Sequence, residues 1–377
     1  MLRRRADRQP TSPLRRTAVP HPFGKRLPRR PPVRHRILLA TVALLAPLTI
    51  SPLALADGRS RPGEDLASHC TGESPIVCTF DVPTGDYDVT VVLGDAASAA
   101  QTSVHAETRR SMVPVTATEA GAFARRAFTV NVREPQGQPT GPVGTPGLTL
   151  TFDGPAPRVA EIVLRPAHRP RRLFIAGDST ACDQDGYPYF GWGQALPSLL
   201  GRGLSVVNHA DSGESSVSFL NGEAFFPALQ QQIQRGDLVL IQFGHNDKST
   251  TAEDFRANLS AMVAGVRERG GRPVLVTSIV RRRFEGSRLN DLGLIIHGDV
   301  NLPAETRAVA AAENVPLIDL TARTRQLVES LGPEGSKPIY LTDINGDNTH
   351  LSEYGAHQYA ALAAEELRAA HLVPGRR

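Results

Sequence analysis

One stretch of the chain decides how it folds: Leu173-Phe174-Ile175-Ala176-Gly177-Asp178-Ser179-Thr180. Its first four residues are apolar and predict a short buried strand. Gly177 breaks the strand and permits backbone geometry that other residues resist. Ser179 follows at the point where a parallel strand leaves its sheet, which is the edge where open α/β folds place their ligands. A serine hydroxyl at this edge is either a helix cap or a nucleophile that needs a base.

The best candidate for that base is His350, because it lies in a polar loop ahead of a helix and not on an apolar stripe. Asp347 precedes it by three residues. On a turn, this spacing lets the carboxylate hold the imidazole tautomer and stabilise the imidazolium. Taken alone, the Asp-x-x-His pattern also fits loop and helix-cap chemistry. With Ser179 earlier in the chain, it favours a serine hydrolase.

Two further stretches with small and polar residues follow predicted strands. Gly213 comes after a strand predicted over 204–208, and its missing side chain lets the backbone approach a substrate closely. Gly244-His245-Asn246-Asp247 ends an almost wholly apolar strand predicted over 237–243. Because parallel strands end at one edge of a sheet, Ser179, Gly213 and Asn246 are expected to lie on the same edge. If these positions were only ordinary turns, the three residues would not need to lie on one edge.

The order of these motifs along the chain, with serine first, then glycine, asparagine and histidine, resembles that of the SGNH (GDSL-like) hydrolase superfamily. Within that superfamily, the chain resembles the rhamnogalacturonan acetylesterases. The resemblance spans about residues 171–370 and rests on five motifs: Gly177-Asp178-Ser179-Thr180, Gly191-Trp192-Gly193-Gln194, Gly244-His245-Asn246-Asp247, Arg281-Arg282-Arg283-Phe284 and Thr349-His350-Leu351-Ser352. The G-x-S-x-G elbow of the rival α/β-hydrolases is missing, because Ala181 stands at its last position.

The resemblance implies that Ser179 attacks an ester, that His350 is its base and that Asp347 orients His350. It also implies an oxyanion hole built from the Ser179 amide, the Gly213 amide and the Asn246 side chain. Losing one such donor typically costs ~10²–10³ in rate.

No metal or cofactor is expected in this mechanism. The Cys and His residues do not have zinc-site spacing. Asp343-x-Asn345-x-Asp347 resembles the start of a calcium loop, but Asn348 stands in place of its glycine and Tyr354 in place of its final glutamate.

The hydrophobic pattern divides the chain into an all-β part and an α/β part. Short period-two strands separated by turn clusters predict a β-sandwich domain over 57–168. Its alternation resembles the galactose-binding-like domains beside bacterial pectin esterases, although it lacks Trp and its aromatic residues fall at core positions. After a basic linker, five predicted strands alternate with helices over 169–377, which indicates a doubly wound parallel sheet. This agrees with the three-layer, flavodoxin-like SGNH esterase domain that the resemblance implies.

The charge of the chain is concentrated at its N-terminus. Residues 1–56 hold 12 of the 42 Lys and Arg and one of the 38 Asp and Glu, which leaves the remainder with a net charge of −7. The overall basicity therefore does not indicate nucleic-acid binding.

The apolar run 37–56 contains two prolines and ends in Ala54-Leu55-Ala56, which predicts a secretory signal with a long basic n-region. The alternative is a transmembrane anchor. A translation start near Val33 is one hypothesis that would explain the unusually long basic lead. We expect a secreted protein that has no membrane segment after cleavage.

Secretion permits disulfides. Cys70 and Cys78 are near in sequence and are expected to pair, which leaves Cys182. Cys182 could be read as a nucleophile, but a buried free cysteine usually behaves as a small apolar residue.

Arg281, Arg282 and Arg283 follow the fourth predicted strand of the α/β part and are candidates to contact substrate. A guanidinium suits a galacturonate carboxylate, and pairing with nearby acidic residues is the alternative. Trp192 and Tyr187 are candidates for walls that face a sugar, although the apolar helix start around Trp192 favours a core position for it.

These observations predict a secreted serine esterase that removes O-acetyl groups from a plant cell-wall polysaccharide, with pectic rhamnogalacturonan favoured. Glu214 weakens that choice, because the resembling enzymes often have a basic residue there. The alternatives are an SGNH lipase, a thioesterase or a deacetylase of another polysaccharide, and an inactive carbohydrate-binding protein. The pattern indicates no particular oligomeric state.

Overall fold

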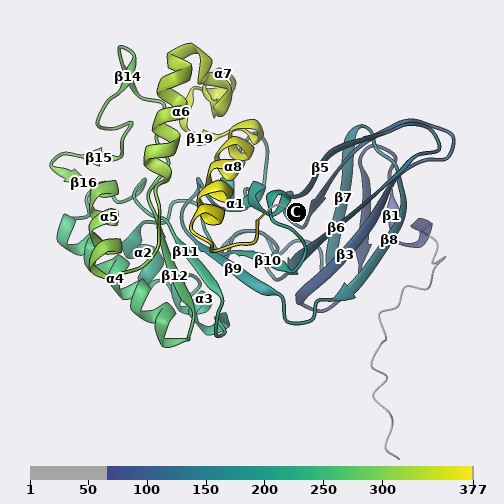
Figure 1. The fold of residues 1–377 in the computed structure, drawn as a ribbon, viewed down its shortest axis with the longest axis horizontal. Coiled ribbons are helices and arrows are strands. Elements are labelled where there is room, and N and C mark those ends of the chain that lie inside the picture. The colour runs from purple at the N-terminus through teal and green to yellow at the C-terminus, as the bar shows by residue number, and fades with distance from the viewer. Residues whose placement is uncertain (1–65, 376–377) are drawn as a thin grey trace, which may run out of the picture. The chain divides into compact units, whose positions relative to one another are not determined.

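The computed structural model describes residues 66–375. The predicted secretory signal, residues 1–56, lies outside this range. The described residues belong to one compact unit, in which a β-rich part precedes an α/β part along the chain (Figure 1). No helix within the described range is long and apolar enough to cross a bilayer.

Two antiparallel sheets make up the β-rich part. One has the strand order β1 (Cys70–Thr71), β2 (Ile76–Phe80), β7 (Leu148–Ala156), β4 (Ala100–Ala106) and β5 (Arg110–Thr118). The other has the order β6 (Phe123–Val132), β3 (Gly85–Gly94) and β8 (Val159–Pro166).

Period-two alternation explains why these strands share a core. In β3, Tyr87, Val89 and Val91 are buried, whereas Thr90 and Val92 between and beyond them are partly exposed. The buried residues of both sheets join one hydrophobic cluster, as expected when two sheets pack face to face. The assignment of 57–168 to a separate, galactose-binding-like domain stays a prediction.

The strand pattern of the sequence does not reveal β5, because Pro114 interrupts its alternation. Pro lacks the N–H that a central strand must donate, but at a sheet edge one side of the strand is unpaired. β5 stands at the edge of its sheet and pairs with β4.

Cys70 and Cys78 form a disulfide between paired positions of β1 and β2, which confirms the predicted pairing. Cys182 is buried and forms no disulfide.

In the α/β part of the described chain, five parallel strands form the predicted sheet. Their order is β10 (Leu204–Asn208), β9 (Arg171–Ala176), β11 (Leu238–Ile241), β12 (Arg272–Val276) and β17 (Leu317–Ile318). This 2-1-3-4-5 order is that of flavodoxin-like folds, in which ligands bind beyond the carboxyl ends of the strands near the first and third. The first and third strands here are β9 and β11.

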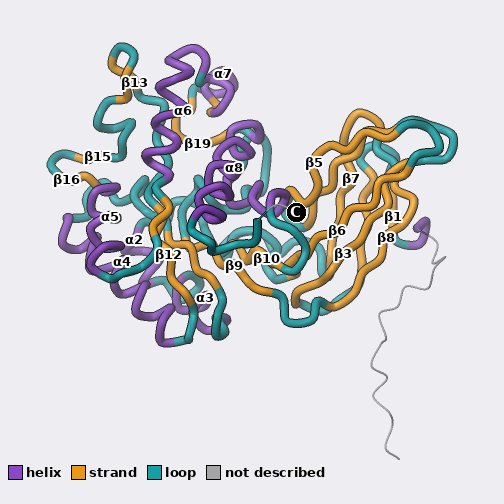
Figure 2. The backbone as a smooth tube through the Cα atoms, in the orientation of Figure 1, coloured by secondary structure: helices purple, strands orange, loops and turns teal. Residues whose placement is uncertain are grey.

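Helices cover both faces of the sheet, as the predicted three layers require (Figure 2). Leu173 and Ile175 of β9 pack with one set of helices, and Phe174 and Ala176 pack with the other. The first set is α1 (Trp192–Ala195), the 3₁₀ turn η2 (Leu196–Leu199), α6 (Leu320–Gly335) and α8 (Glu353–Ala369). The second set is α2 (Ser216–Asn221), α3 (Phe226–Gln232), α4 (Ala252–Glu268) and α5 (Leu302–Ala312).

Short elements complete the described chain. They are η1 (Leu66–Ser68), β13 (Phe284–Glu285), β14 (Arg288–Leu289), β15 (Ile296–His297), β16 (Val300–Asn301), η3 (Lys337–Ile339), β18 (Tyr340–Leu341), α7 (Thr342–Asn345) and β19 (Asp347–Leu351). β19 carries His350 directly into α8, whose first turn is capped by Ser352: its hydroxyl accepts a hydrogen bond from the Gly355 amide at 3.0 Å. The cap fixes where the chain turns after His350.

Candidate active site

Ser179 lies in a tight turn directly after β9. The carbonyl oxygen of Asp178 accepts hydrogen bonds from the Ala181 and Cys182 amides, at 3.0 and 3.1 Å. The carbonyl oxygen of Ser179 itself accepts one from Gln184 Nε2 at 2.7 Å. These bonds hold the turn, so that the serine side chain is presented at the carboxyl edge of the sheet.

The structure brings Ser179, His350 and Asp347 together. His350 Nε2 is 2.9 Å from Ser179 Oγ, and His350 Nδ1 is 2.6 Å from Asp347 Oδ2. A carboxylate can only accept, so the Nδ1 of a neutral ring carries the proton. Nε2 is then free to accept the Ser179 hydroxyl proton, which is the arrangement that a general base needs.

The Asp347 carboxylate is held in its charged form. Burial alone would raise its pKa, but hydrogen bonds from the His350 ring and from the His350 and Thr349 amides outweigh burial and keep the pKa well below its usual range. A charged carboxylate favours an imidazolium beside it.

The predicted oxyanion groups lie on neighbouring loops. Asn246 Nδ2 donates to the Glu214 carbonyl at 3.0 Å, which joins the loop after β11 to the Gly213 loop after β10. Ser212, in that second loop, is 3.5 Å from the Cys182 sulfur of the nucleophile turn. Within the described residues, the backbone N–H groups of Ser179 and Gly213 donate no hydrogen bond. Both remain available to a substrate oxygen.

A second aspartate–histidine pair lies beside the first. His245 Nδ1 is 3.2 Å from Asp178 Oδ2, and both side chains are buried. Asp178 Oδ1 also accepts from the amide and hydroxyl of Thr180, at 2.9 and 2.7 Å. Burial alone would raise the pKa of Asp178, but His245 and these hydrogen bonds lower it. The sequence motifs contain both residues but do not reveal that they pair.

The three predicted arginines have different surroundings. Arg281 is half-buried and donates from Nη2 to the His245 carbonyl at 2.8 Å. Arg282 is partly exposed, and its guanidinium is bound to the Pro333 carbonyl and to Asn348 Oδ1, so its contact with substrate stays a prediction. These bonds hold the loop before His350. Arg283 is exposed and remains a candidate for substrate binding.

Trp192 is fully buried, which contradicts its candidacy as a wall that faces a sugar and confirms the core position that its apolar surroundings favoured. Its Nε1 donates to Gln242 Oε1 at 2.9 Å, and Gln242 Nε2 donates to Thr180 Oγ1 at 3.0 Å. Trp192 thus packs under the nucleophile turn. Tyr187, by contrast, is 73% exposed.

The β-rich part supplies a buried ion network that sequence reasoning missed. Arg110 of β5 donates from Nε to Asp183 Oδ2 at 2.8 Å, and Arg133 approaches the same oxygen at 3.2 Å. Asn208 Nδ2 donates to the other oxygen of Asp183 at 2.8 Å. Asp183 is four residues after Ser179, so these bonds tie the nucleophile loop to the β-rich part. A charge buried in this way must be paired.

The loop after β6 reaches the Gly213 loop as well. The Asp211 carboxylate accepts from the amide and the hydroxyl of Thr140, at 2.8 and 2.9 Å, and the Ser212 amide donates to Gln138 Oε1 at 2.7 Å. The β-rich part therefore braces both loops that flank the candidate site.

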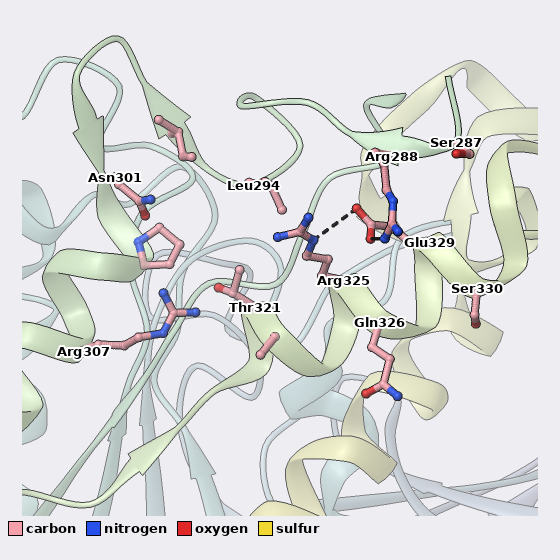
Figure 3. Close-up of a pocket in the computed structure, with 13 residues that line it drawn as sticks. Ser287, Arg288, Leu294, Asn301, Arg307, Thr321, Arg325, Gln326, Glu329 and Ser330 are labelled. Atoms are coloured by element: carbon pink, nitrogen blue, oxygen red, sulfur yellow. Dashed lines mark hydrogen bonds and ion pairs between the residues drawn. The ribbon is translucent and has the colours of Figure 1, made fainter. Parts of the chain in front are cut away.

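A cavity of about 690 Å³ lies elsewhere, between α5, α6 and the hairpins that follow Arg283 (Figure 3). Arg288, Arg325 and Glu329 gather at one side of it through ion pairs. None of the site residues predicted from the sequence lines it. In residues 66–375, no group of three or more His, Cys, Asp or Glu side chains is placed to hold a metal ion.

The fold and the serine–imidazole–carboxylate chain define a hydrolase-like site at the edge of the sheet in a three-layer α/β fold. Residues 175–358 match the model of the GDSL-like lipase/acylhydrolase family. The chain is 39% identical over 213 residues to rhamnogalacturonan acetylesterase RhgT of Bacillus subtilis, covering 52% of this chain and 89% of that protein. It is 30% identical over 207 residues to the probable rhamnogalacturonan acetylesterase YesY of the same organism, covering 52% and 92%.

Among solved structures, that of protein YxiM from Bacillus subtilis is 25% identical and superposes with a TM-score of 0.49, covering 79% of this chain and 81% of that one. The extent of the match to RhgT settles the family: this chain belongs to the GDSL-like lipase/acylhydrolases and is a carboxylic-ester hydrolase.

Proposed function

We propose that this chain is a serine carbohydrate esterase that removes O-acetyl groups from pectic rhamnogalacturonan. The observation that carries the proposal is the hydrogen-bonded chain Ser179–His350–Asp347 at the strand-end edge of the sheet. The choice of substrate is supported by the names of two similar proteins, rhamnogalacturonan acetylesterase RhgT and probable rhamnogalacturonan acetylesterase YesY.

In the proposed reaction, Ser179 Oγ attacks the acetyl carbonyl while His350 Nε2 takes the hydroxyl proton. The Ser179 and Gly213 amides and Asn246 Nδ2 stabilise the oxyanion. The intermediate collapses to an acetyl-enzyme, and His350 returns the proton to the departing sugar oxygen. His350 then deprotonates a water that attacks the acetyl-enzyme, which releases acetate and restores Ser179.

The charges around the site both help and oppose an acidic polymer. Arg281 and the exposed Arg283 place positive charge near the active edge. Glu214 shares its loop with Gly213, and its carboxyl pKa is raised mainly by burial. In its charged form, the Glu214 carboxylate repels a galacturonate.

The test is acetate release from acetylated rhamnogalacturonan, compared with acetylated xylan and with p-nitrophenyl acetate, for the wild type and Ser179→Ala. We expect release from the pectic polymer but not from xylan, and loss of all release in the variant. Release from xylan alone would show that the substrate is a polysaccharide other than rhamnogalacturonan. Cleavage of the small ester alone would favour a lipase-like or thioesterase-like enzyme, and inactivity on every ester would favour a carbohydrate-binding protein.

We also propose that the protein is secreted, on the strength of the signal predicted over residues 1–56. N-terminal sequencing of the protein from the culture medium should give a start near Asp57. Retention of residues 1–56 on a cell-bound protein would contradict this.

A further inference from the structure

Tyr187 is an exposed aromatic residue with an unusually fixed position. Its side chain is 73% exposed, the highest value among the exposed large apolar and aromatic side chains of the described residues. Scattered exposed apolar residues are common on proteins, so exposure alone identifies no site. What distinguishes Tyr187 is the set of contacts that hold its ring in place.

One face of the Tyr187 ring is covered by a cation from the β-rich part. The Arg109 guanidinium carbon lies 3.9 Å from the ring centroid, within the range of a cation–π interaction. Arg109 comes from the turn between β4 and β5, and its Nη1 donates to the Tyr189 carbonyl at 3.2 Å. Because Arg109 occupies one face, the high exposure of Tyr187 must come from the other face and the edge.

The rim of the ring is also held. The Tyr187 hydroxyl donates to Glu353 Oε2 at 3.2 Å, and the other carboxylate oxygen of Glu353 is 3.7 Å from His105 Nε2. A side chain fixed on one face and at its hydroxyl loses little conformational entropy when a ligand covers the open face.

The ring stands next to the candidate chemistry. Tyr189, two residues further along, packs edge-on against the His350 ring, with centroids 5.4 Å apart and an interplanar angle of 86°. Asn345 Nδ2 donates to the Tyr189 hydroxyl at 3.1 Å. The short segment from Tyr187 to Tyr189 therefore links the open aromatic face to the imidazole that contacts Ser179.

We propose that the open face of Tyr187 is a carbohydrate-stacking subsite, which holds a pyranose ring of the polymer while an acetylated unit lies at Ser179. The inference rests on the proposed carbohydrate substrate. A pyranose presents a face of C–H bonds, and the negative face of an aromatic ring attracts such polarised hydrogens. Arg109 of the β-rich part would then support the subsite.

The subsite separates polymer binding from the chemistry at Ser179. A small ester such as p-nitrophenyl acetate has no pyranose to stack on Tyr187, so the loss of the ring should raise KM for the polymer without changing turnover of the small ester. For Tyr187→Ala we expect KM for acetylated rhamnogalacturonan to rise about tenfold, the effect of one lost stacking contact. The kcat/KM for p-nitrophenyl acetate should stay within about twofold of the wild type.

Two variants serve as controls. Tyr187→Phe keeps the ring and its Arg109 contact and should keep KM for the polymer within about threefold. Phe123→Ala removes another exposed aromatic side chain, on β6, and should leave both substrates unaffected. Circular dichroism checks that each variant is folded.

An unchanged KM for the polymer in Tyr187→Ala would overturn the subsite and leave the proposed function standing. An equal loss on polymer and small ester would also overturn it, because the ring would then position His350 and not bind sugar. If the wild type releases acetate only from xylan, the same comparison is made on xylan, and the pectic substrate alone is rejected. If the wild type releases acetate from neither polymer, the proposed function and the subsite both fall.

Discussion

Two aspartate–histidine pairs lie close to Ser179, and they differ in burial and in what the imidazole reaches. Asp347 and His350 are 2.6 Å apart, with side chains 22% and 30% exposed. Asp178 and His245 are 3.2 Å apart, with side chains 0% and 2% exposed. His350 Nε2 contacts Ser179 Oγ, whereas His245 Nε2 is buried and has no hydrogen-bond partner in the described part of the chain.

The difference shows that an imidazole bound to a carboxylate is not by itself a general base. The ring must also lie within hydrogen-bond distance of the nucleophile, and a substrate that enters from solvent must be able to contact it. Asp178 instead binds the backbone and hydroxyl of Thr180, next to Ser179. We therefore assign the exposed pair to proton transfer and the buried pair to positioning of the nucleophile turn.

The largest expected effect separates the two pairs directly. Asp347→Asn should lower kcat for p-nitrophenyl acetate by about 10⁴, because an amide cannot hold the imidazole in the tautomer that accepts the serine proton. Asp343→Asn is the matched control, since Asp343 is a nearby exposed aspartate on α7, and it should leave kcat unchanged. A variant Asp347→Asn that keeps most of its activity would show that the exposed pair is not the catalytic one.

A smaller effect is expected at Asn246, the neighbour of His245. The strand end buries His245 and leaves Asn246 partly exposed, beside the Gly213 loop. Asn246→Ala should lower kcat by ~10²–10³ with little change in KM, as for the loss of one oxyanion donor. Steady-state kinetics on the small ester measures this, with Asn221→Ala on the surface of α2 as control. A rise in KM at constant kcat would assign Asn246 to substrate binding instead.

The smallest effect on turnover is expected for the buried pair itself. His245→Gln should keep kcat of the folded enzyme within about tenfold, because His245 touches no reacting atom. Its stability should fall by about 3 kcal/mol, since the change leaves a buried carboxylate without its partner. Calorimetry measures the loss as a Tm several degrees lower. A large loss of kcat at unchanged Tm would place His245 in the proton-transfer path.

Local patterns allowed much of this site to be predicted from the sequence. Ser179, Gly213 and Asn246 each follow a strand whose apolar run is visible, and parallel strands bring such positions to one edge. His350 follows Asp347 by three residues, so their contact needs only a turn. The structure places all of these residues on neighbouring loops.

Contacts between distant parts of the chain could not be predicted in this way. Arg110 and Asp183 are 73 residues apart, and no local sequence motif links the two positions. The hydrogen bond of Trp192 could not be predicted for a related reason: its partner, Gln242, lies 50 residues away on another strand end. The bonds of Arg282 could not be predicted either, because its partners, Pro333 and Asn348, come from the far end of the chain.

The central claim is that Ser179 is a nucleophile activated by His350, and covalent labelling tests it most directly. The protein would be treated with a fluorophosphonate, and the adduct located by peptide mass spectrometry in the wild type, Ser179→Ala and His350→Gln. The account predicts one adduct, on Ser179, its absence in Ser179→Ala, and labelling at least about a hundredfold slower in His350→Gln. An adduct on another residue such as Cys182, or equal labelling rates with and without His350, would contradict it.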